Sequence, residues 1–159
     1  MKLNKKQILK IRKNRDPYLL IDYATKIVPG KSIEGYKNLK KNEWFFKVHW
    51  QGDPNMPGML QVEAMVQMSS LIIFTLPNIN EKTLYLANAT NIKFFKKIIP
   101  GDKLEILSKL VSSNRGLYKF EAEGYVKKKI ACKADFTLIL PGSVYISPNK
   151  NKLTACKKK

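Results

Sequence analysis

Hydrophobic side chains occupy most positions of residues 57–74, so that a helix built from this segment would have no polar face. A helix that is apolar all round is buried inside a protein. Proline is favoured in the first turn of a helix, as at Pro57, and Pro77 closes the segment. The pattern predicts one long central helix with a single carboxylate, Glu63, in its apolar wall.

Alternating apolar and polar residues predict strands after this helix, separated by turns at 100–101, 114–116 and 127–129. Before it, the pattern predicts a short amphipathic helix near 4–12 and a helix running into a strand over 18–28. One helix followed by a meander is typical of an α+β domain. The expected strands or extended segments are 31–39, 44–48, 83–96, 102–113, 116–128 and 130–140.

The chain has 159 residues, 44% of them hydrophobic, which is enough for one domain with a substantial core. We expect that domain to span 1–142 and the lysine-rich end, 143–159, to be a mobile tail. Charges in the first fifteen residues leave no secretory segment, and no membrane span is expected. Cys132 in a strand and Cys156 in the tail predict neither a disulfide nor a metal site, which fits a reducing cytoplasm.

The chemistry of the sequence centres on His49, the one histidine, which lies in a Gly/Pro-rich loop over 49–56. This imidazole and the Glu63 carboxylate can meet only if the loop folds back on the helix, or on a second copy of it in a dimer. The plainer alternative is that His49 fills a turn and Glu63 sits on a solvated face. We favour a functional Glu63, because a carboxylate in an apolar wall is costly to desolvate.

The start of the central helix adds a third group. Gly58, directly after Pro57, lets a ligand approach the backbone, and its N–H is one of the unpaired donors at a helix N-terminus. The positive end of the helix dipole lies at the same place and would polarise a bound carbonyl oxygen. His49, Glu63 and Gly58 together predict acid/base chemistry beside a carbonyl group.

Four blocks resemble the (3R)-hydroxyacyl-acyl-carrier-protein dehydratases of the FabZ type, collinearly over about residues 8 to 140. They are RDPYLLIDYATKIVPGKSIEGYKNL, WFFKVHWQGDPNMPGMLQVEAMVQ, NIKFFKKIIPGDKLEI and YKFEAEGYVKKKIACKADFTLIL. The resemblance implies a hot-dog fold, in which an antiparallel sheet wraps around a long central helix. It also implies that two subunits share each active site, with a trimer of dimers as the larger assembly to consider.

The resemblance assigns His49 and Glu63 as the catalytic pair and the Gly58 amide as thioester-binding, with Pro57, Met59 and Trp50 around the substrate. A related branch that also isomerises its product has aspartate at the helix position, so Glu63 indicates the dehydratase-only branch. Tyr85 falls where some relatives have an aromatic gate to the acyl tunnel; packing within a sheet is the alternative. No cofactor and no metal is implied.

The histidine loop departs from the family's usual Gly-His-Phe-Pro-Gly at Val48, Trp50 and Gln51. Valine does not readily take the positive φ open to glycine, and Gln51 frees a φ angle that proline fixes. Trp50 is bulkier than phenylalanine and would narrow the acyl site or repack its rim. An unusual substrate or weakened activity is therefore an open prediction.

The net charge of +18 favours an acidic partner. An acyl carrier protein would meet Lys93, Lys96 and Lys97, which the resemblance places near the tunnel mouth. Nucleic acid is the rival partner, but arginines are few and the lysines are not interleaved with aromatics, which argues against sequence-specific binding. Compositional bias that keeps the protein soluble is the plainest explanation for any single lysine.

The function expected from the sequence is a lyase of fatty acid, or related lipid or polyketide, biosynthesis. It would eliminate water from a 3-hydroxyacyl thioester to give a trans-2-enoyl thioester. Three alternatives stay open: a hot-dog acyl thioesterase, a non-catalytic acyl-thioester binder, and a basic nucleic-acid-binding protein. Acyl chain length and pathway do not follow from the sequence.

Overall fold

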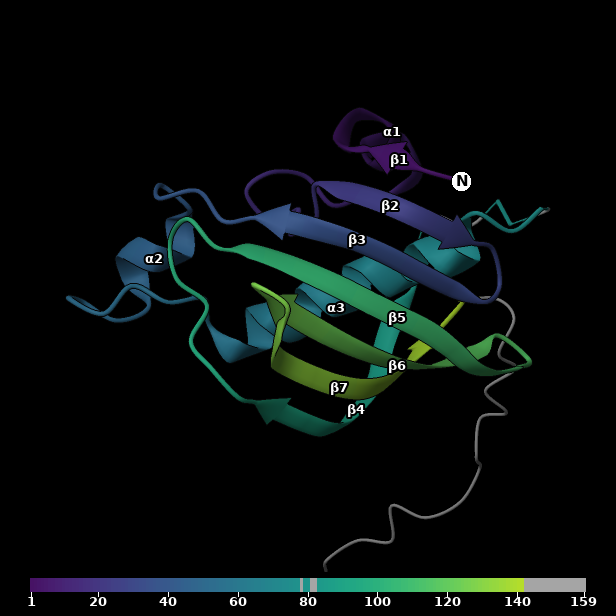
Figure 1. Ribbon diagram of the computed structural model, residues 1–159. Coiled ribbons are helices and arrows are strands. Elements are labelled where there is room, and N and C mark those ends of the chain that lie inside the picture. The colour runs from purple at the N-terminus through teal and green to yellow at the C-terminus, as the bar shows by residue number, and fades with distance from the viewer. Residues whose placement is uncertain (78, 81–82, 142–159) are drawn as a thin grey trace, which may run out of the picture.

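One antiparallel sheet wraps around a single long helix in the computed structural model, which describes residues 1–77, 79–80 and 83–141 (Figure 1). This is the hot-dog arrangement expected from the sequence. In chain order the elements are β1 (Leu3–Asn4), α1 (Lys5–Ile11), β2 (Tyr23–Val28), β3 (Ser32–Asn38), α2 (Trp44–Val48), α3 (Gly58–Phe74), β4 (Tyr85–Phe94), β5 (Lys103–Asn114), β6 (Leu117–Val126) and β7 (Lys129–Ile139).

The seven strands of the described residues lie in the order β1-β2-β3-β5-β6-β7-β4, and every neighbouring pair is antiparallel. β5, β6 and β7 form the expected meander. β4, although it directly follows α3 in the chain, pairs with β7 and not with β5. The strand that follows the helix therefore forms one edge of the sheet, with nothing paired to its outer side among the described residues.

The predicted central helix is confirmed, with Pro57 as the residue before its first turn. Most of α3 is buried against β3, β5, β6 and β7. Buried serines on it are paired: the Ser69 hydroxyl donates to the Met65 carbonyl and accepts from the Ser108 hydroxyl of β5, each at 2.7 Å. Pairing matters because an unsatisfied polar group in a core costs about 1–3 kcal/mol.

Two expected elements are wrong. No helix forms over residues 18–22, directly before β2: Leu19, Leu20 and Ile21 are all buried in a segment that is neither helix nor strand. Residues 44–48 are the helix α2, not a strand; Phe45 and Phe46 are both buried, whereas successive side chains of a strand point to opposite faces of the sheet. The other expected elements are confirmed to within about two residues at each end.

Tight turns join the meander where the sequence predicted them. Arg115 and Gly116 have positive φ between β5 and β6, and so do Lys127 and Lys128 between β6 and β7. Two consecutive positive φ values are the signature of the type I′ hairpin turn, which glycine and asparagine favour. The lysine pair therefore adopts a backbone conformation that is unfavourable for its residue type.

The predicted tail over 143–159, with Cys156, lies outside the described residues. Among the residues that are described, no helix is long and apolar enough to cross a lipid bilayer. Cys132 lies in β7 as expected; it is buried, and burial raises the pKa of its thiol to about 12.

Candidate functional site

Glu63 faces a hollow of about 330 Å³ beside the second turn of α3. Burial raises the pKa of its carboxyl group above the ordinary value; a hydrogen bond from Gln67 and the charge of Arg12 act in the opposite direction. Tyr85 of β4 lines the same hollow. The hollow is lined by Arg12, Lys13, Asn14, Glu63, Val66, Phe74, Thr83, Leu84, Tyr85 and Leu86.

His49 is held at the end of α2 by three contacts. Its backbone N–H donates to the Phe45 carbonyl at 3.0 Å, and its ring stacks on Trp50 with centroids 4.8 Å apart. Nδ1 lies 3.1 Å from the Asn55 carbonyl oxygen. Because a carbonyl oxygen only accepts, Nδ1 carries the proton in the neutral ring, and the lone pair on Nε2 is available as a base.

The departures in the histidine loop fit this geometry. Val48 is the last residue of α2 and does not have a positive φ; the left-handed conformation falls instead at Gly52, with φ 80°. The loop is fixed at its other end by Met56, whose N–H donates to the Ile98 carbonyl and whose own carbonyl accepts from Gln61. Replacing the family glycine by Val48 therefore puts no strain on the backbone in this conformation.

Among the described residues of one chain, the two predicted catalytic groups are not brought into contact. His49 is not among the residues that line the Glu63 hollow. No hydrogen bond or ion pair joins the two residues in the part of the chain that the structure describes. The sequence named two ways in which these groups could meet, and the described residues show no contact for the first, in which the loop folds back onto its own helix.

The Gly58 amide stands at the first position of α3, and no acceptor for it is present among the described residues. The N–H groups of Leu60 and Gln61 both donate to Pro57. The ring of Phe94, from β4, packs directly on Gly58: an added Cβ would lie 2.7 Å from the ring. Glycine is thus required here by close approach and not by an unusual φ.

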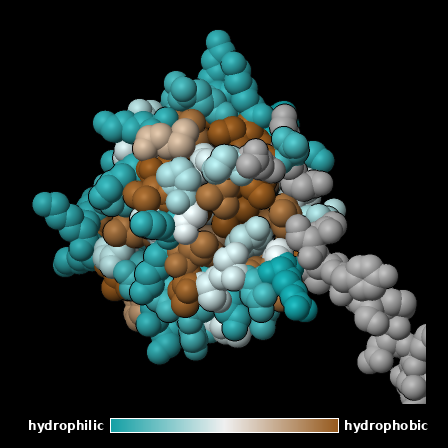
Figure 2. Space-filling view, turned by 90° about the vertical axis from the view of Figure 1, so that its right-hand side faces the viewer, coloured by the Kyte–Doolittle hydropathy of each residue, from teal (hydrophilic) through white to brown (hydrophobic). Residues whose placement is uncertain are grey.

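The surface near these groups is unusually apolar. Met59 is 61% exposed and Tyr85 is 62% exposed, while Trp50 and Phe94 are also exposed. Every residue of β4 is exposed or only partly buried, although the strand is rich in apolar side chains. Figure 2 views the opposite end of the molecule, where α3 ends, and shows a further group of hydrophobic side chains among hydrophilic ones. An apolar patch around an open sheet edge marks an interaction surface.

The three predicted carrier-binding lysines differ in environment. Lys93 is exposed on β4, opposite Lys133 of β7, and Lys96 is half-buried just after the strand. Lys97 forms an ion pair with Asp53 of the histidine loop. The segment after β4 is thus tied to the loop that carries His49.

Sequence reasoning missed two residues that control Glu63. Gln67, one helical turn further along α3, is fully buried and donates to Glu63 at 2.9 Å. Arg12, 9% exposed, donates from Nη1 to the Gln67 carbonyl at 3.1 Å. The one available signal was the i, i+4 spacing of Glu63 and Gln67; Arg12 looked like one more residue of a basic N-terminal segment.

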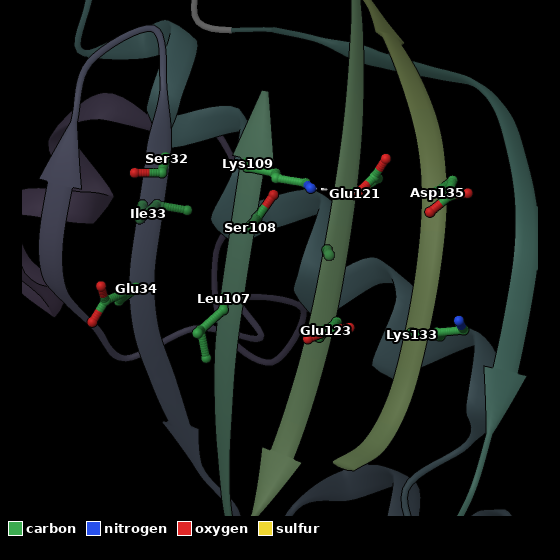
Figure 3. A pocket seen from close by; sticks show the side chains of 11 residues that line it. Ser32, Ile33, Glu34, Leu107, Ser108, Lys109, Glu121, Glu123, Lys133 and Asp135 are labelled. Atoms are coloured by element: carbon green, nitrogen blue, oxygen red, sulfur yellow. Dashed lines mark ion pairs between the residues drawn. The ribbon is translucent and has the colours of Figure 1, made fainter. Parts of the chain in front are cut away.

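A larger hollow, about 510 Å³, lies on the outer face of the sheet over β3, β5, β6 and β7 (Figure 3). It contains none of the predicted site residues. Its acidic side chains stand among lysines, and Lys109 pairs with Glu121 at 2.8 Å. We regard it as a charged outer surface and place the candidate site at α3.

The chain is similar to a known protein family along most of its length. The model of the FabA-like domain matches residues 13–135. The protein named 3-hydroxyacyl-[acyl-carrier-protein] dehydratase FabZ from Geobacter metallireducens is 39% identical over 131 residues, covering 81% of this chain and 87% of the relative. The protein of that name from Alkaliphilus metalliredigens is 36% identical over 152 residues, covering 96% of this chain and all of the relative.

Solved structures agree on the fold. A chain of the dehydratase heterocomplex ApeI:P from Xenorhabdus doucetiae matches with a TM-score of 0.73 and 12% identity, covering 84% of this chain and 90% of that one. A hypothetical thioesterase protein from Streptococcus pneumoniae matches with a TM-score of 0.57 and 16% identity, covering 75% of this chain and 89% of that one. These two likenesses establish the fold alone.

Proposed function

Because the chain belongs to the FabA-like family, with FabZ dehydratases as curated relatives, we propose that it is a (3R)-hydroxyacyl-acyl-carrier-protein dehydratase. The observation that carries the proposal is a half-buried carboxylate, Glu63, on the long and largely apolar central helix α3. The proposed reaction removes water from a 3-hydroxyacyl thioester and gives a trans-2-enoyl thioester. We assign it to fatty acid biosynthesis in the cytoplasm.

The proposed mechanism gives each group one task. The Gly58 N–H, at the positive end of α3, donates a hydrogen bond to the thioester carbonyl oxygen and so makes the C2 proton more acidic. The Nε2 lone pair of His49 takes that proton, while the carbonyl of Asn55 holds the ring in the required tautomer. Glu63 delivers a proton to the departing hydroxyl group, which leaves as water. Proton exchange between the imidazolium and the Glu63 carboxylate, through solvent, restores the enzyme.

We further propose that two copies of the chain build each site. The lack of contact between His49 and Glu63 among the described residues of one chain supports this arrangement, as does the open edge of β4 with its exposed apolar side chains. A second β4 paired to this edge would cover the exposed strand, and twofold symmetry would bring the histidine loop of one copy to the Glu63 hollow of the other. Met59, Trp50 and Tyr85 would then line the acyl chain's path.

A mixing experiment tests both the roles and the shared site. His49→Ala and Glu63→Gln should each abolish hydration of a crotonoyl thioester, followed by loss of enoyl absorbance, and leave the assembly intact by size-exclusion chromatography. When the two inactive variants are unfolded together and refolded, each mixed dimer has one site with both groups intact, so about one quarter of the wild-type activity should return. No recovery, with exchange of subunits verified by a mass tag, would show that each site lies within one chain.

The proposed carrier is an acidic acyl carrier protein. Lys93→Glu and Lys96→Glu should raise KM for crotonoyl-carrier protein and leave KM for crotonoyl-coenzyme A nearly unchanged, because the lysines would contact the carrier and not the thioester. Lys119→Glu, an exposed lysine of β6, is the matched control. An equal effect of all three substitutions would mean that net charge, and not a docking surface, governs the encounter.

A further inference from the structure

Arg12 is a buried cation with an unusual set of partners. Its Nη1 donates to the carbonyl of Gln67 and to the hydroxyl of Ser70, both on α3, and Nη2 donates to Asn14 at 2.6 Å. Nε is buried without a hydrogen-bond partner, and no ion pair to the guanidinium is present among the described residues. Burial lowers its pKa to about 10, so it keeps its charge at neutral pH. A buried charge is costly, and packing alone gives little reason to retain one.

The guanidinium and the Glu63 carboxylate share one hollow. They do not touch; Gln67 stands between them, accepting from Arg12 through its backbone and donating to Glu63 through its side chain. Gln67 is itself fixed, because its side chain also donates to the Tyr18 carbonyl and accepts from the Leu20 N–H, each at 2.9 Å. The segment 12–20 therefore determines both the orientation of Glu63 and the charge nearest to it.

Few other charges face Glu63. Lys13 lines the hollow but is exposed, so water screens its charge. The pKa of Tyr18 is raised by burial and by the charge of Glu63, so its hydroxyl group is neutral at physiological pH. Arg12 is the buried cation whose field opposes the cost of ionising Glu63 in an apolar wall.

We propose that Arg12 is a positioning residue that, acting across Gln67, keeps the ionised form of Glu63 accessible. Glu63 can then exchange a proton in both directions, protonating the leaving hydroxyl in dehydration and activating water in hydration. The catalytic part of this inference rests on the proposed function. The effect of Arg12 on the ionisation of Glu63 does not rest on the proposed function, because it can be measured even if the protein has no catalytic activity.

The test follows the titration of Glu63 by carbon NMR of protein labelled at the glutamate side-chain carboxyl, with the signal assigned by its loss in Glu63→Gln. Arg12→Met fills similar space without the charge, Arg12→Lys retains the charge, and Ser70→Ala removes one partner of the guanidinium but no charge. The midpoint should move to higher pH in Arg12→Met and stay near the wild-type value in the other two. The acidic limb of kcat/KM against pH should move in the same direction.

Each outcome decides a different point. An unmoved midpoint in a folded Arg12→Met protein overturns the inference; should that variant not fold, Arg12→Gln replaces it, with the same reading. If the midpoint moves in Arg12→Met but the wild-type protein has no dehydratase activity, the inference stands and the proposed function is rejected. A moved midpoint in Arg12→Lys as large as in Arg12→Met would show that shape, and not charge, is what Arg12 supplies, and would overturn it too.

Discussion

Replacing Gln67 by leucine should cost far more stability than the same substitution at Gln61. Both glutamines lie buried on α3, so the substitution and its surroundings are matched. The Gln67 side chain makes three hydrogen bonds, to Tyr18, Leu20 and Glu63. The Gln61 side chain makes one, and its Oε1 has no hydrogen-bond partner among the described residues.

The magnitude follows from what each substitution leaves behind. Gln67→Leu leaves the fully buried Leu20 N–H without a partner, which costs about 1–3 kcal/mol, and removes a hydrogen bond to a charged group worth about 1.5–3 kcal/mol. We expect a total of about 4 kcal/mol, because the Tyr18 carbonyl can form a replacement hydrogen bond with water and adds little to the cost. Gln61→Leu also removes an oxygen that already lacks a partner, so its cost should be about 1 kcal/mol.

Urea unfolding followed by circular dichroism, at one fixed protein concentration, measures the difference. With a slope of about 2 kcal/mol per M, the midpoint of Gln67→Leu should lie about 1.5 M below that of Gln61→Leu. Equal midpoints, or a lower midpoint for Gln61→Leu, would refute the idea that segment 12–20 is held to α3 through the Gln67 side chain.

Three further outcomes follow from charge and backbone geometry. Burial raises the pKa of Glu63, so the folded state binds the carboxyl proton more tightly than the unfolded state does. Stability therefore falls as pH rises through the interval between the unfolded and folded pKa values. Glu63→Gln should unfold at a higher urea concentration than wild type at neutral pH, and this difference should shrink at acid pH. Lys37, 4% exposed, pairs with Glu43 at 2.8 Å, so Lys37→Met should cost about 3–5 kcal/mol in urea unfolding at pH 7, whereas exposed Lys26→Met should cost under about 0.5 kcal/mol. Lys128→Gly removes an unfavourable positive φ and should raise the unfolding free energy by about 1 kcal/mol in a thermal melt; a loss of stability would contradict the turn geometry.

Sequence patterns located the elements whose signal is local. The helix over 58–74 was found because apolar side chains surround it, and the meander because its strands alternate and end at turns. α2 was missed because five residues are too few to show a helical period, and its two buried phenylalanines look like part of a strand. The place of β4 at the sheet edge beside β7 depends on long-range pairing, which no local pattern encodes.

The residues of the candidate site could likewise be found from the sequence only where their signal is local. His49, Glu63 and Gly58 stood out because their residue types and neighbours carry chemistry. The spacing of His49 and Glu63 left both a folded-back loop and a second copy of the chain open, so it did not predict that the described residues of one chain show no contact between them. Arg12 was missed because its meaning lies in a contact with Gln67, 55 positions further along, and in a degree of burial that a basic N-terminal segment does not suggest.

The burial of most of α3 also constrains how the protein can be synthesised. The helix is finished at Phe74, but the strands that cover it continue to Ile139, 65 residues later. At ribosomal rates of about 5–20 residues per second, a nascent chain would carry this apolar segment uncovered for about 3 to 13 s. Gene fragments that stop before β6 and β7 should therefore accumulate as aggregates, and yields from expression should rise when translation is slowed by cooling or when holdase chaperones are supplied in excess.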